Sequence, residues 1–193
     1  MAEITLILGG ARSGKSAFAE KLATEADADV TYIATAEVLD EEIQTRVLHH
    51  KERRLKSWNT WEGLPEDLPK AISKMKGTLI LDCLTMWLTR LTFATDVAEN
   101  GSEEQWLTRE LEIRELTEKL CRSVKDDTRL IIVSNEIGFG LVPESRLSRR
   151  FRDMQGRMNQ LCAKHADHVA LVVAGCPLWV KKSSISSNYL RSY

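Results

Sequence analysis

The chain has 193 residues, 43% of them hydrophobic, which is enough for one α/β domain with a substantial core and leaves little room for a second. Lys and Arg number 27 against 28 Asp and Glu, and this balance excludes a global basic field of the kind that binds nucleic acid or anionic membranes. The four cysteines are widely spaced, with no secretory leader and no apolar run of membrane-spanning length, so we expect a cytoplasmic protein with reduced thiols and no membrane span.

The first element in chain order is an apolar strand over residues 4–8, followed by a stretch that fits the phosphate-binding pattern G-x-x-x-x-G-K-[ST] at every fixed position. A helical pattern over 16–26 comes next, which is the context this pattern requires. We expect the backbone N–H groups of the stretch and the helix dipole to face a nucleoside triphosphate. The stretch consists of Gly9, Gly10, Ala11, Arg12, Ser13, Gly14, Lys15 and Ser16.

Four residues of this stretch carry the predicted chemistry. Lys15 adds positive charge for the β- and γ-phosphates, and Ser16 offers its hydroxyl to Mg²⁺. Gly9 and Gly14 permit backbone conformations that larger residues avoid. The alternative is an ordinary glycine-rich turn between a strand and a helix.

A second strand is predicted over residues 29–36, because this segment is rich in β-branched and aromatic residues. In open α/β sheets, ligands gather at the carboxyl ends of the strands. Ala34, Thr35 and Ala36 are therefore expected to meet the nucleotide. A plain strand end without a ligand explains the same residues equally well.

The charged segment 40–56 predicts a helix with one cationic face. Arg46, His50 and Arg54 stand at i, i+4 and i+8 and so share this face, whereas His49 lies about 100° round the helix. A bound polyanion such as triphosphate would relieve the repulsion along the row, although charge runs are usually solvated surface. We expect Lys51, Arg53 and Arg54 to bind the nucleotide.

His50 is the better of the two histidines for a catalytic role, because it shares the arginine face. A histidine near a triphosphate can act as a general base, as a spectator, or as a nucleophile whose neutral imidazole attacks phosphorus. The residues alone leave these three roles open.

The next segment holds two tryptophans and leads to a third strand. Trp58 and Trp61 are expected to pack against the sheet edge, and Glu62 to accept a hydrogen bond from a base or ribose. Residues 77–84 predict a buried strand that closes on Asp82. An acid at this position of a P-loop protein holds Mg²⁺ directly or through water, and it can also cap the helix that follows.

Predicted helices within residues 84–126 break near 100–102 and carry no chemistry. A buried strand over 129–134 then leads into Asn135 and Glu136 on a glycine-containing turn. These polar side chains suit contact with the acceptor substrate or the attacking hydroxyl. A turn without a ligand is the alternative.

Residues 144–166 predict a long helix, so the D-x-x-G tetrad inside it is not a GTPase signature. His165 and His168 fit helix-end and strand-start roles better than a metal site, because no third ligand has suitable spacing. A last buried strand covers 169–175.

At least five apolar strands thus alternate with helices along the chain, which is typical of an α/β fold with a mostly parallel central sheet and helices on both faces. We predict a single P-loop NTPase-type domain over residues 1–182, followed by a loose polar tail over 183–193.

With these motifs in place, the chain resembles the bifunctional adenosylcobinamide kinase/adenosylcobinamide-phosphate guanylyltransferase family of cobalamin biosynthesis, over residues 4 to about 182. A P-loop recurs across many enzymes, whereas the ordered set of motifs is far more specific. The set comprises Gly9 to Ser16, Tyr32 to Ala36, the row of Arg46, His50 and Arg54 followed by Trp58, Leu81 to Thr85, Ser134 to Gly138, and Gly156 to Gln160.

The resemblance implies two reactions. A nucleoside triphosphate phosphorylates the aminopropanol hydroxyl of adenosylcobinamide, and GMP then passes from GTP to that phosphate through a covalent GMP-histidine, for which the matching residue is His50. It further implies ATP and GTP as substrates, Mg²⁺ as cofactor and a compact homotrimer.

Two other interpretations remain open. One is a single-activity P-loop kinase of a small metabolite, in which His50 only helps to bind phosphate. The other is a nucleotide-dependent switch without enzymatic activity, which would be expected to carry the guanine-reading pattern N-K-x-D, and the chain lacks that pattern.

Overall fold

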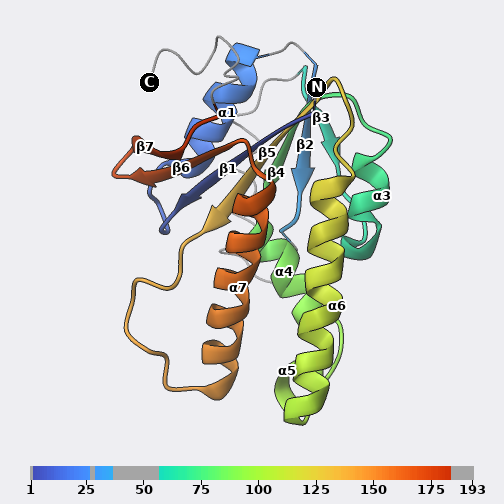
Figure 1. The fold of residues 1–193 in the computed structure, drawn as a ribbon, viewed down its shortest axis with the longest axis vertical. Helices are drawn as coiled ribbons and strands as arrows, with labels where there is room; N and C mark the ends of the chain where they lie inside the picture. The colour runs from blue at the N-terminus through green and yellow to red at the C-terminus, as the bar shows by residue number, and fades with distance from the viewer. Residues whose placement is uncertain (1, 27–28, 37–56, 184–193) are drawn as a thin grey trace.

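The computed structural model describes residues 2–26, 29–36 and 57–183, which form a seven-stranded sheet with helices packed against it (Figure 1). The strands lie in the order β3-β2-β4-β5-β1-β6-β7 and are parallel except for β7, which pairs antiparallel with β6. The strands are β1 Glu3–Gly9, β2 Val30–Ala34, β3 Asn59–Trp61, β4 Gly77–Asp82, β5 Thr128–Asn135, β6 His168–Val173 and β7 Cys176–Lys181.

The helices lie on both faces of the sheet. α1 packs on one face, where Phe18 and Leu22 enter a core with residues of β1, β2, β4 and β5. The other face is covered by α3, α4, α6 and α7, with α6 and α7 running side by side (Figure 1). The helices are α1 Lys15–Ala26, η1 Pro65–Asp67, α3 Leu68–Ile72, α4 Leu84–Phe93, α5 Val97–Asn100, α6 Glu103–Arg122 and α7 Arg146–His165.

β1 occupies the interior of the sheet because its side chains are apolar on both faces. Leu6 belongs to the core under α3, α4, α6 and α7, and Ile7 belongs to the core under α1, and both are fully buried. Successive side chains of a strand point to opposite faces, and a parallel strand covered on both sides is apolar throughout.

The register of the strands brings their carboxyl ends to one edge. Gly9 of β1 pairs with Asn135 of β5 and with Val172 of β6. Asp82 of β4 pairs with Ala34 of β2 and, on its other side, with a residue of β5. Loops that follow these strands therefore meet at the same edge, which is where parallel α/β sheets bind ligands.

α6 and α7 are joined near the start of each helix by charged side chains. Ser102 and Gln105 form a capping box at the start of α6. Glu103, in its first turn, accepts hydrogen bonds from Arg150 and Arg146 of α7, and these bonds lower the pKa of the Glu103 carboxyl. The Glu103 carboxylate is exposed, so its ion pairs with the two arginines add little to the free energy of unfolding. They fix how α6 and α7 lie against each other.

The predicted α/β fold is confirmed, and the five predicted strands correspond to β1, β2, β4, β5 and β6. The segment 84–126 holds three helices, not two, because the chain also breaks at Thr95 and Asp96 before α5. β3 and β7 were not predicted, since β3 has three residues and β7 is largely exposed. The predicted helix over 40–56 and the tail after Ser183 lie outside the described residues. None of the described helices combines the length and the apolar character needed to cross a membrane.

Candidate functional site

The shape of the loop between β1 and α1 depends on two glycines. Gly14 has a φ of 96°, a region that side chains with a Cβ rarely adopt. At Gly9, a Cβ would lie 2.4 Å from Ser13 Oγ and 2.7 Å from the carbonyl oxygen of Val172. Both glycines of the phosphate-binding pattern are therefore required by the local backbone.

Lys15 is the first residue of α1, and its side chain turns back over the loop. Nζ donates to the carbonyl oxygen of Gly10 at 3.0 Å, and the residue is buried. Phe18 N donates to the carbonyl of Gly14, which begins the helical pattern. The amides before it have no intrahelical acceptor, and the positive end of the helix dipole lies here. This arrangement can bind a phosphate.

Two neighbouring segments hold the loop in place. Gly175 N, in the turn between β6 and β7, donates to Ser13 O at 2.8 Å, and Glu136 N donates to Gly9 O at 3.1 Å. Ser13 Oγ is buried and has no hydrogen-bond partner within the described part of the chain. A buried hydroxyl without a partner is uncommon in folded proteins.

Asp82, the predicted metal-side acid, is half-buried at the end of β4. Tyr32 of β2 donates its hydroxyl proton to Asp82 Oδ2 at 2.7 Å. Just after the strand, the Thr35 hydroxyl donates to the carbonyl of Cys83 at 2.8 Å and accepts from the Cys83 amide at 2.7 Å. The Tyr32 hydroxyl thus orients the Asp82 carboxylate, and the Thr35 hydroxyl fixes the backbone of the residue that follows it.

The thiol of Cys83, the residue directly after Asp82, is buried at the end of β4. Burial raises the pKa of this thiol to about 12, the Asp82 carboxylate adds to the rise, and the Lys15 ammonium opposes it. Lys15 comes after the end of β1 and Asp82 ends β4, so both residues lie at the edge of the sheet where the carboxyl ends of the strands are found.

We expect only one of the four cysteines to react quickly with Ellman's reagent in the native protein. Cys176 is exposed, whereas Cys83, Cys121 and Cys162 are buried. The hydrogen bond to Cys121, together with burial, raises the pKa of Cys162 well above its ordinary value. A thiol with a pKa far above the assay pH stays protonated and is a poor nucleophile.

The Cys176→Ser variant is the control for this experiment. Its native form should show no fast phase, and its remaining thiols should titrate only after unfolding. A fast phase that survives in this variant would contradict the burial described for the other three.

Asn135 and Glu136, the predicted substrate residues, lie beside the phosphate-binding loop. Asn135 ends β5 opposite Gly9, and its backbone N donates to Thr85 Oγ1 at 3.0 Å. The Glu136 carboxylate accepts from Gly138 N at 2.8 Å. Both residues therefore lie at the same edge as the loop.

The other predicted site residues are less central. Ala34, Thr35 and Ala36 lie at the carboxyl end of β2, where the Thr35 hydroxyl is occupied by Cys83. Glu62 is exposed after β3, with β2, β4 and β5 between that strand and β1. The candidates outside the described residues are Arg46, His49, His50, Lys51, Arg53 and Arg54.

Four residues that hold this edge were not predicted from the sequence. Tyr32 and Thr85 support the ends of β4 and β5, and the sequence marks them only as members of the motifs that carry the family resemblance, without a role in the site. Gln155 and Asn159 stand four apart on the buried face of α7, where the helical pattern calls for apolar residues. Two polar residues at such positions are a signal that could have identified them.

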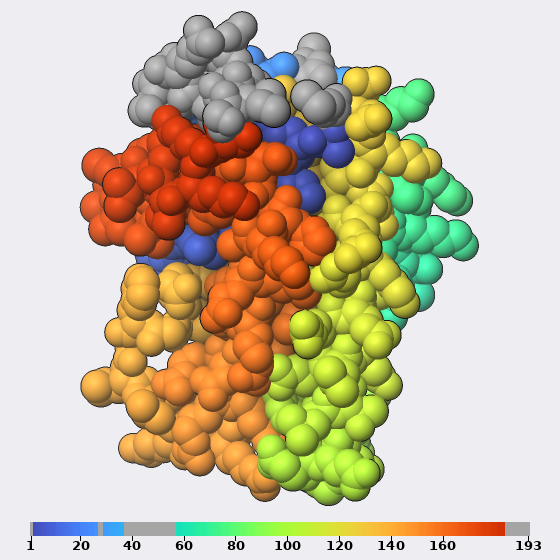
Figure 2. All heavy atoms as spheres, in the orientation of Figure 1, coloured from blue at the N-terminus to red at the C-terminus, as the bar shows by residue number. Residues whose placement is uncertain are grey.

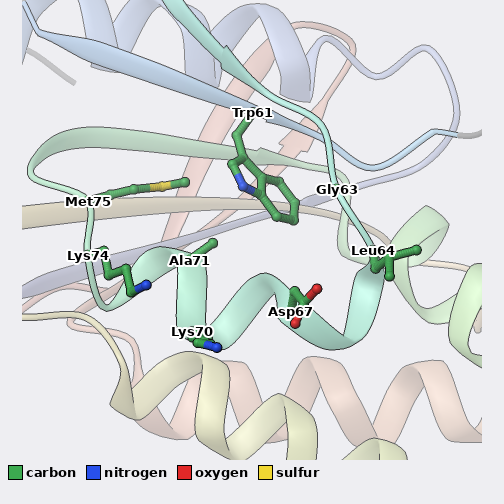
Figure 3. A pocket seen from close by; sticks show the side chains of 8 residues that line it. All are labelled: Trp61, Gly63, Leu64, Asp67, Lys70, Ala71, Lys74 and Met75. Carbon is green, nitrogen blue, oxygen red and sulfur yellow. The ribbon is translucent and has the colours of Figure 1, made fainter.

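A pocket of about 490 Å³ opens between the end of β3 and α3 (Figure 3). Trp61 lies across from the helix, which contributes Lys70, and Lys74 lines the pocket from the turn after the helix (Figure 3). Neither Glu62 nor any residue of the phosphate-binding loop lines this pocket. The pocket therefore lies beside the predicted nucleotide contact Glu62 and is separate from the loop. Its lining residues are Trp61, Gly63, Leu64, Asp67, Lys70, Ala71, Lys74 and Met75.

Oxygen ligands suited to a divalent cation are present in the loop and at the end of β4. Ser16 offers a hydroxyl and Asp82 a carboxylate. In residues 2–26, 29–36 and 57–183, no group of three or more His, Cys, Asp or Glu could hold a metal ion. Mg²⁺ commonly binds one or two carboxylates together with water and substrate phosphates. The residues fit an ion that arrives with a nucleotide.

Comparisons with known proteins found a matching family model and similar curated proteins. A family model described as cobinamide kinase / cobinamide phosphate guanyltransferase matches residues 5–180. The bifunctional adenosylcobalamin biosynthesis protein CobU of Salmonella typhimurium is 39% identical over 182 residues, covering 91% of this chain and 98% of that protein. The bifunctional adenosylcobalamin biosynthesis protein CobP of Pseudomonas aeruginosa is 40% identical, covering 91% of this chain and 96% of that protein.

Solved structures resemble this chain in fold alone. An ATPase from the type III secretion system of pathogenic bacteria matches with a TM-score of 0.56 at 13% identity, over 98% of this chain and 60% of that one. The match supports a P-loop NTPase-type fold.

Proposed function

The chain belongs to the cobinamide kinase / cobinamide phosphate guanyltransferase family and is a transferase, and from this premise we propose that it carries out two successive reactions. A nucleoside triphosphate phosphorylates adenosylcobinamide, and GMP is then transferred from GTP to adenosylcobinamide phosphate, giving adenosylcobinamide-GDP and pyrophosphate. The observation that carries the proposal is the match to this family over residues 5–180, together with a phosphate-binding loop in which Lys15 Nζ lies over the carbonyl oxygen of Gly10.

The test supplies adenosylcobinamide together with ATP or GTP and follows both products. We expect nucleoside diphosphate to form only when the corrinoid is present, and pyrophosphate to follow when GTP is present. Turnover that does not depend on the corrinoid would contradict the proposal. Phosphorylation without any release of pyrophosphate would favour the alternative of a single-activity kinase.

In the kinase step, the chain acts mainly by position and charge. The loop amides and the Lys15 ammonium bind the β- and γ-phosphates, so charge that develops on them in the transition state is stabilised. Ser16 and Asp82 would hold Mg²⁺, which supplies additional positive charge to the phosphates when bound. The Tyr32 hydroxyl keeps the Asp82 carboxylate oriented toward this task.

Replacing Asp82 with asparagine is expected to lower both activities about 100-fold and to raise the Mg²⁺ concentration needed for half-maximal rate. The amide keeps the size of the side chain and removes its charge. The measurement is a titration of rate against Mg²⁺, with Asp96→Asn as the control, because Asp96 is an exposed acid before α5. An unchanged Mg²⁺ dependence in Asp82→Asn would remove Asp82 from the metal site.

For the guanylyl transfer we propose a covalent GMP-histidine at His50. A neutral imidazole attacks the α-phosphorus of GTP and pyrophosphate leaves, with Lys15 and the arginines of segment 40–56 neutralising its charge. The phosphate of the corrinoid then takes GMP from the histidine. Nucleotide contacts from Lys51, Arg53, Arg54 and Glu62 belong to the same proposal.

We propose that the enzyme works as a homotrimer in the cytoplasm. Phe139, Leu141 and Val142 are 82%, 96% and 68% exposed in the β5–α7 connection, which forms the lower left edge of the molecule in Figure 2. An exposed apolar group of this kind favours self-association. The unpaired cysteines suit a reducing compartment. A molar mass in solution equal to one chain would contradict the trimer.

A further inference from the structure

The carboxyl end of β5 is tied to α7 by buried polar side chains. Asn159 Nδ2 donates to the carbonyl oxygen of Asn135 at 3.1 Å. Its Oδ1 accepts from Ser134 Oγ at 2.7 Å and from Gln155 Nε2 at 3.0 Å, and Gln155 also donates to Ser134 Oγ at 3.0 Å. Gln155 and Ser134 are fully buried and Asn159 is 5% exposed. α7 therefore holds the carboxyl end of β5 through hydrogen bonds that are shielded from water.

These bonds fix the backbone of Asn135 and leave its side chain available. The carbonyl is held by Asn159 and the amide N by Thr85 Oγ1, and the next amide, of Glu136, is held by Gly9 O. The side-chain amide of Asn135 has one hydrogen-bond partner among the described residues, the Cys83 sulfur at 3.9 Å. Sulfur is a weak acceptor, so this amide can donate to a stronger one.

The position of Asn135 suits a bound phosphate. In the sheet it stands opposite Gly9, where the phosphate-binding loop begins, and β5 lies between β1 and β4, the strand that ends in Asp82. The Cys83 thiol that contacts the Asn135 amide belongs to the residue directly after Asp82. The Asn135 amide thus lies at the end of the strand between the start of the phosphate-binding loop and the predicted metal-side acid.

We propose that Asn135 donates a hydrogen bond to the terminal phosphate of the bound nucleoside triphosphate, and that Gln155 and Asn159 of α7 are positioning residues that hold it there. The inference rests on the two-reaction function proposed above and assigns a specific task within its kinase step. A donor held in place before the reaction stabilises transferring charge without having to reorganise.

The make-up of the cluster supports a role beyond stability. Gln155 Oε1 is buried without a hydrogen-bond partner in the described residues, and an unsatisfied buried acceptor lowers stability. Its neighbours on that face of α7, Met154 and Met158, are apolar. An apolar residue at position 155 would suit packing alone, whereas a glutamine is needed to hold the Asn159 amide in the orientation that reaches Asn135.

The test is a double-mutant cycle on corrinoid phosphorylation, using Asn135→Ala, Asn159→Ala and the pair, with kcat and KM for the nucleoside triphosphate measured separately. We expect Asn159→Ala to lower kcat about 10-fold and Asn135→Ala between about 10-fold and 100-fold, each with KM changed less than about threefold. Because Asn159 acts through Asn135, the pair should be no slower than Asn135→Ala alone, within about twofold.

Thr117→Val is the matched control, because Thr117 is also a fully buried, hydrogen-bonded helix residue and its hydroxyl donates to the Ile113 carbonyl within α6. It should lower the melting temperature without changing kcat. If Asn159→Ala does not fold, Gln155→Met takes its place in the cycle, since it removes the unpartnered acceptor and keeps the side-chain length.

Two results would overturn the positioning role. One is a double variant whose fold-decrease in kcat equals the product of the decreases in the two single variants. The other is a folded Asn159→Ala or Gln155→Met enzyme with kcat within twofold of the unaltered protein. The unaltered protein is assayed in parallel. If it shows no corrinoid-dependent turnover, the proposed function fails, and that outcome is distinct from a failure of the positioning role.

Discussion

Replacing His50 with alanine is expected to abolish covalent labelling of the chain by GTP that carries its label at the α-phosphorus. The reason is chemical, because alanine offers no nucleophile for the α-phosphorus, and no GMP can be held between GTP and the corrinoid. Guanylyl transfer should fall to background. Phosphorylation of adenosylcobinamide should stay within a few-fold of the unaltered enzyme, since it requires no covalent intermediate.

The neighbouring histidine supplies the control. His49→Ala should label normally, because the helical spacing predicts that His50, and not His49, shares a face with Arg46 and Arg54. The label should be lost in acid and kept in base, as expected for a phosphorus–nitrogen bond. Loss of labelling in His49→Ala with retention in His50→Ala would reverse the assignment, and label in both variants would place the intermediate elsewhere.

Replacing Lys15 with methionine is expected to lower both activities by about 1,000-fold or more. Methionine keeps much of the length of the side chain, and it removes the ammonium that is held over the loop by Gly10. Both reactions develop charge on the phosphates bound there, so both lose the same stabilisation. The measurement is kcat and kcat/KM for each step, with the affinity for nucleotide determined by titration.

Lys21→Met is the matched control for that experiment. Lys21 is on the same helix, is exposed and pairs with Glu25 at 4.0 Å, a surface ion pair that contributes little to stability. Its activities should stay within about twofold of the unaltered enzyme. A Lys15→Met enzyme that kept either activity within 10-fold would show that the phosphates of that reaction lie away from the loop.

The parts of the fold that were predicted correctly are those with strong local patterns. β1, β4 and β5 are continuous apolar runs, and the capping box that begins α6 is visible as Ser102 and Gln105. β3 and β7 lack such patterns. β3 has only three residues, and β7 is largely exposed and has Pro177 near its start. Their place at the two edges of the sheet depends on pairing with β2 and β6, which is not encoded locally.

The candidate site divides in the same way. The phosphate-binding loop, Asp82 and Asn135 could be predicted because each follows an apolar strand, and chain order places such residues at one sheet edge. The hydrogen bonds that hold this edge could not be predicted. Asn135 bonds to Thr85, which is 50 residues away in the sequence, and to Asn159, which is 24 residues away. Such partners are side chains of ordinary type brought together by the tertiary fold.

The place of β1 between β5 and β6 has a consequence for how the protein is made. The phosphate-binding loop is synthesised directly after β1, yet the strands on either side of β1 start only at Thr128 and His168. A growing chain therefore holds the apolar β1 without its neighbouring strands until β5 and β6 have been synthesised, the situation in which chaperones are recruited. The loop after β1 can take up its folded surroundings only once both strands have been added.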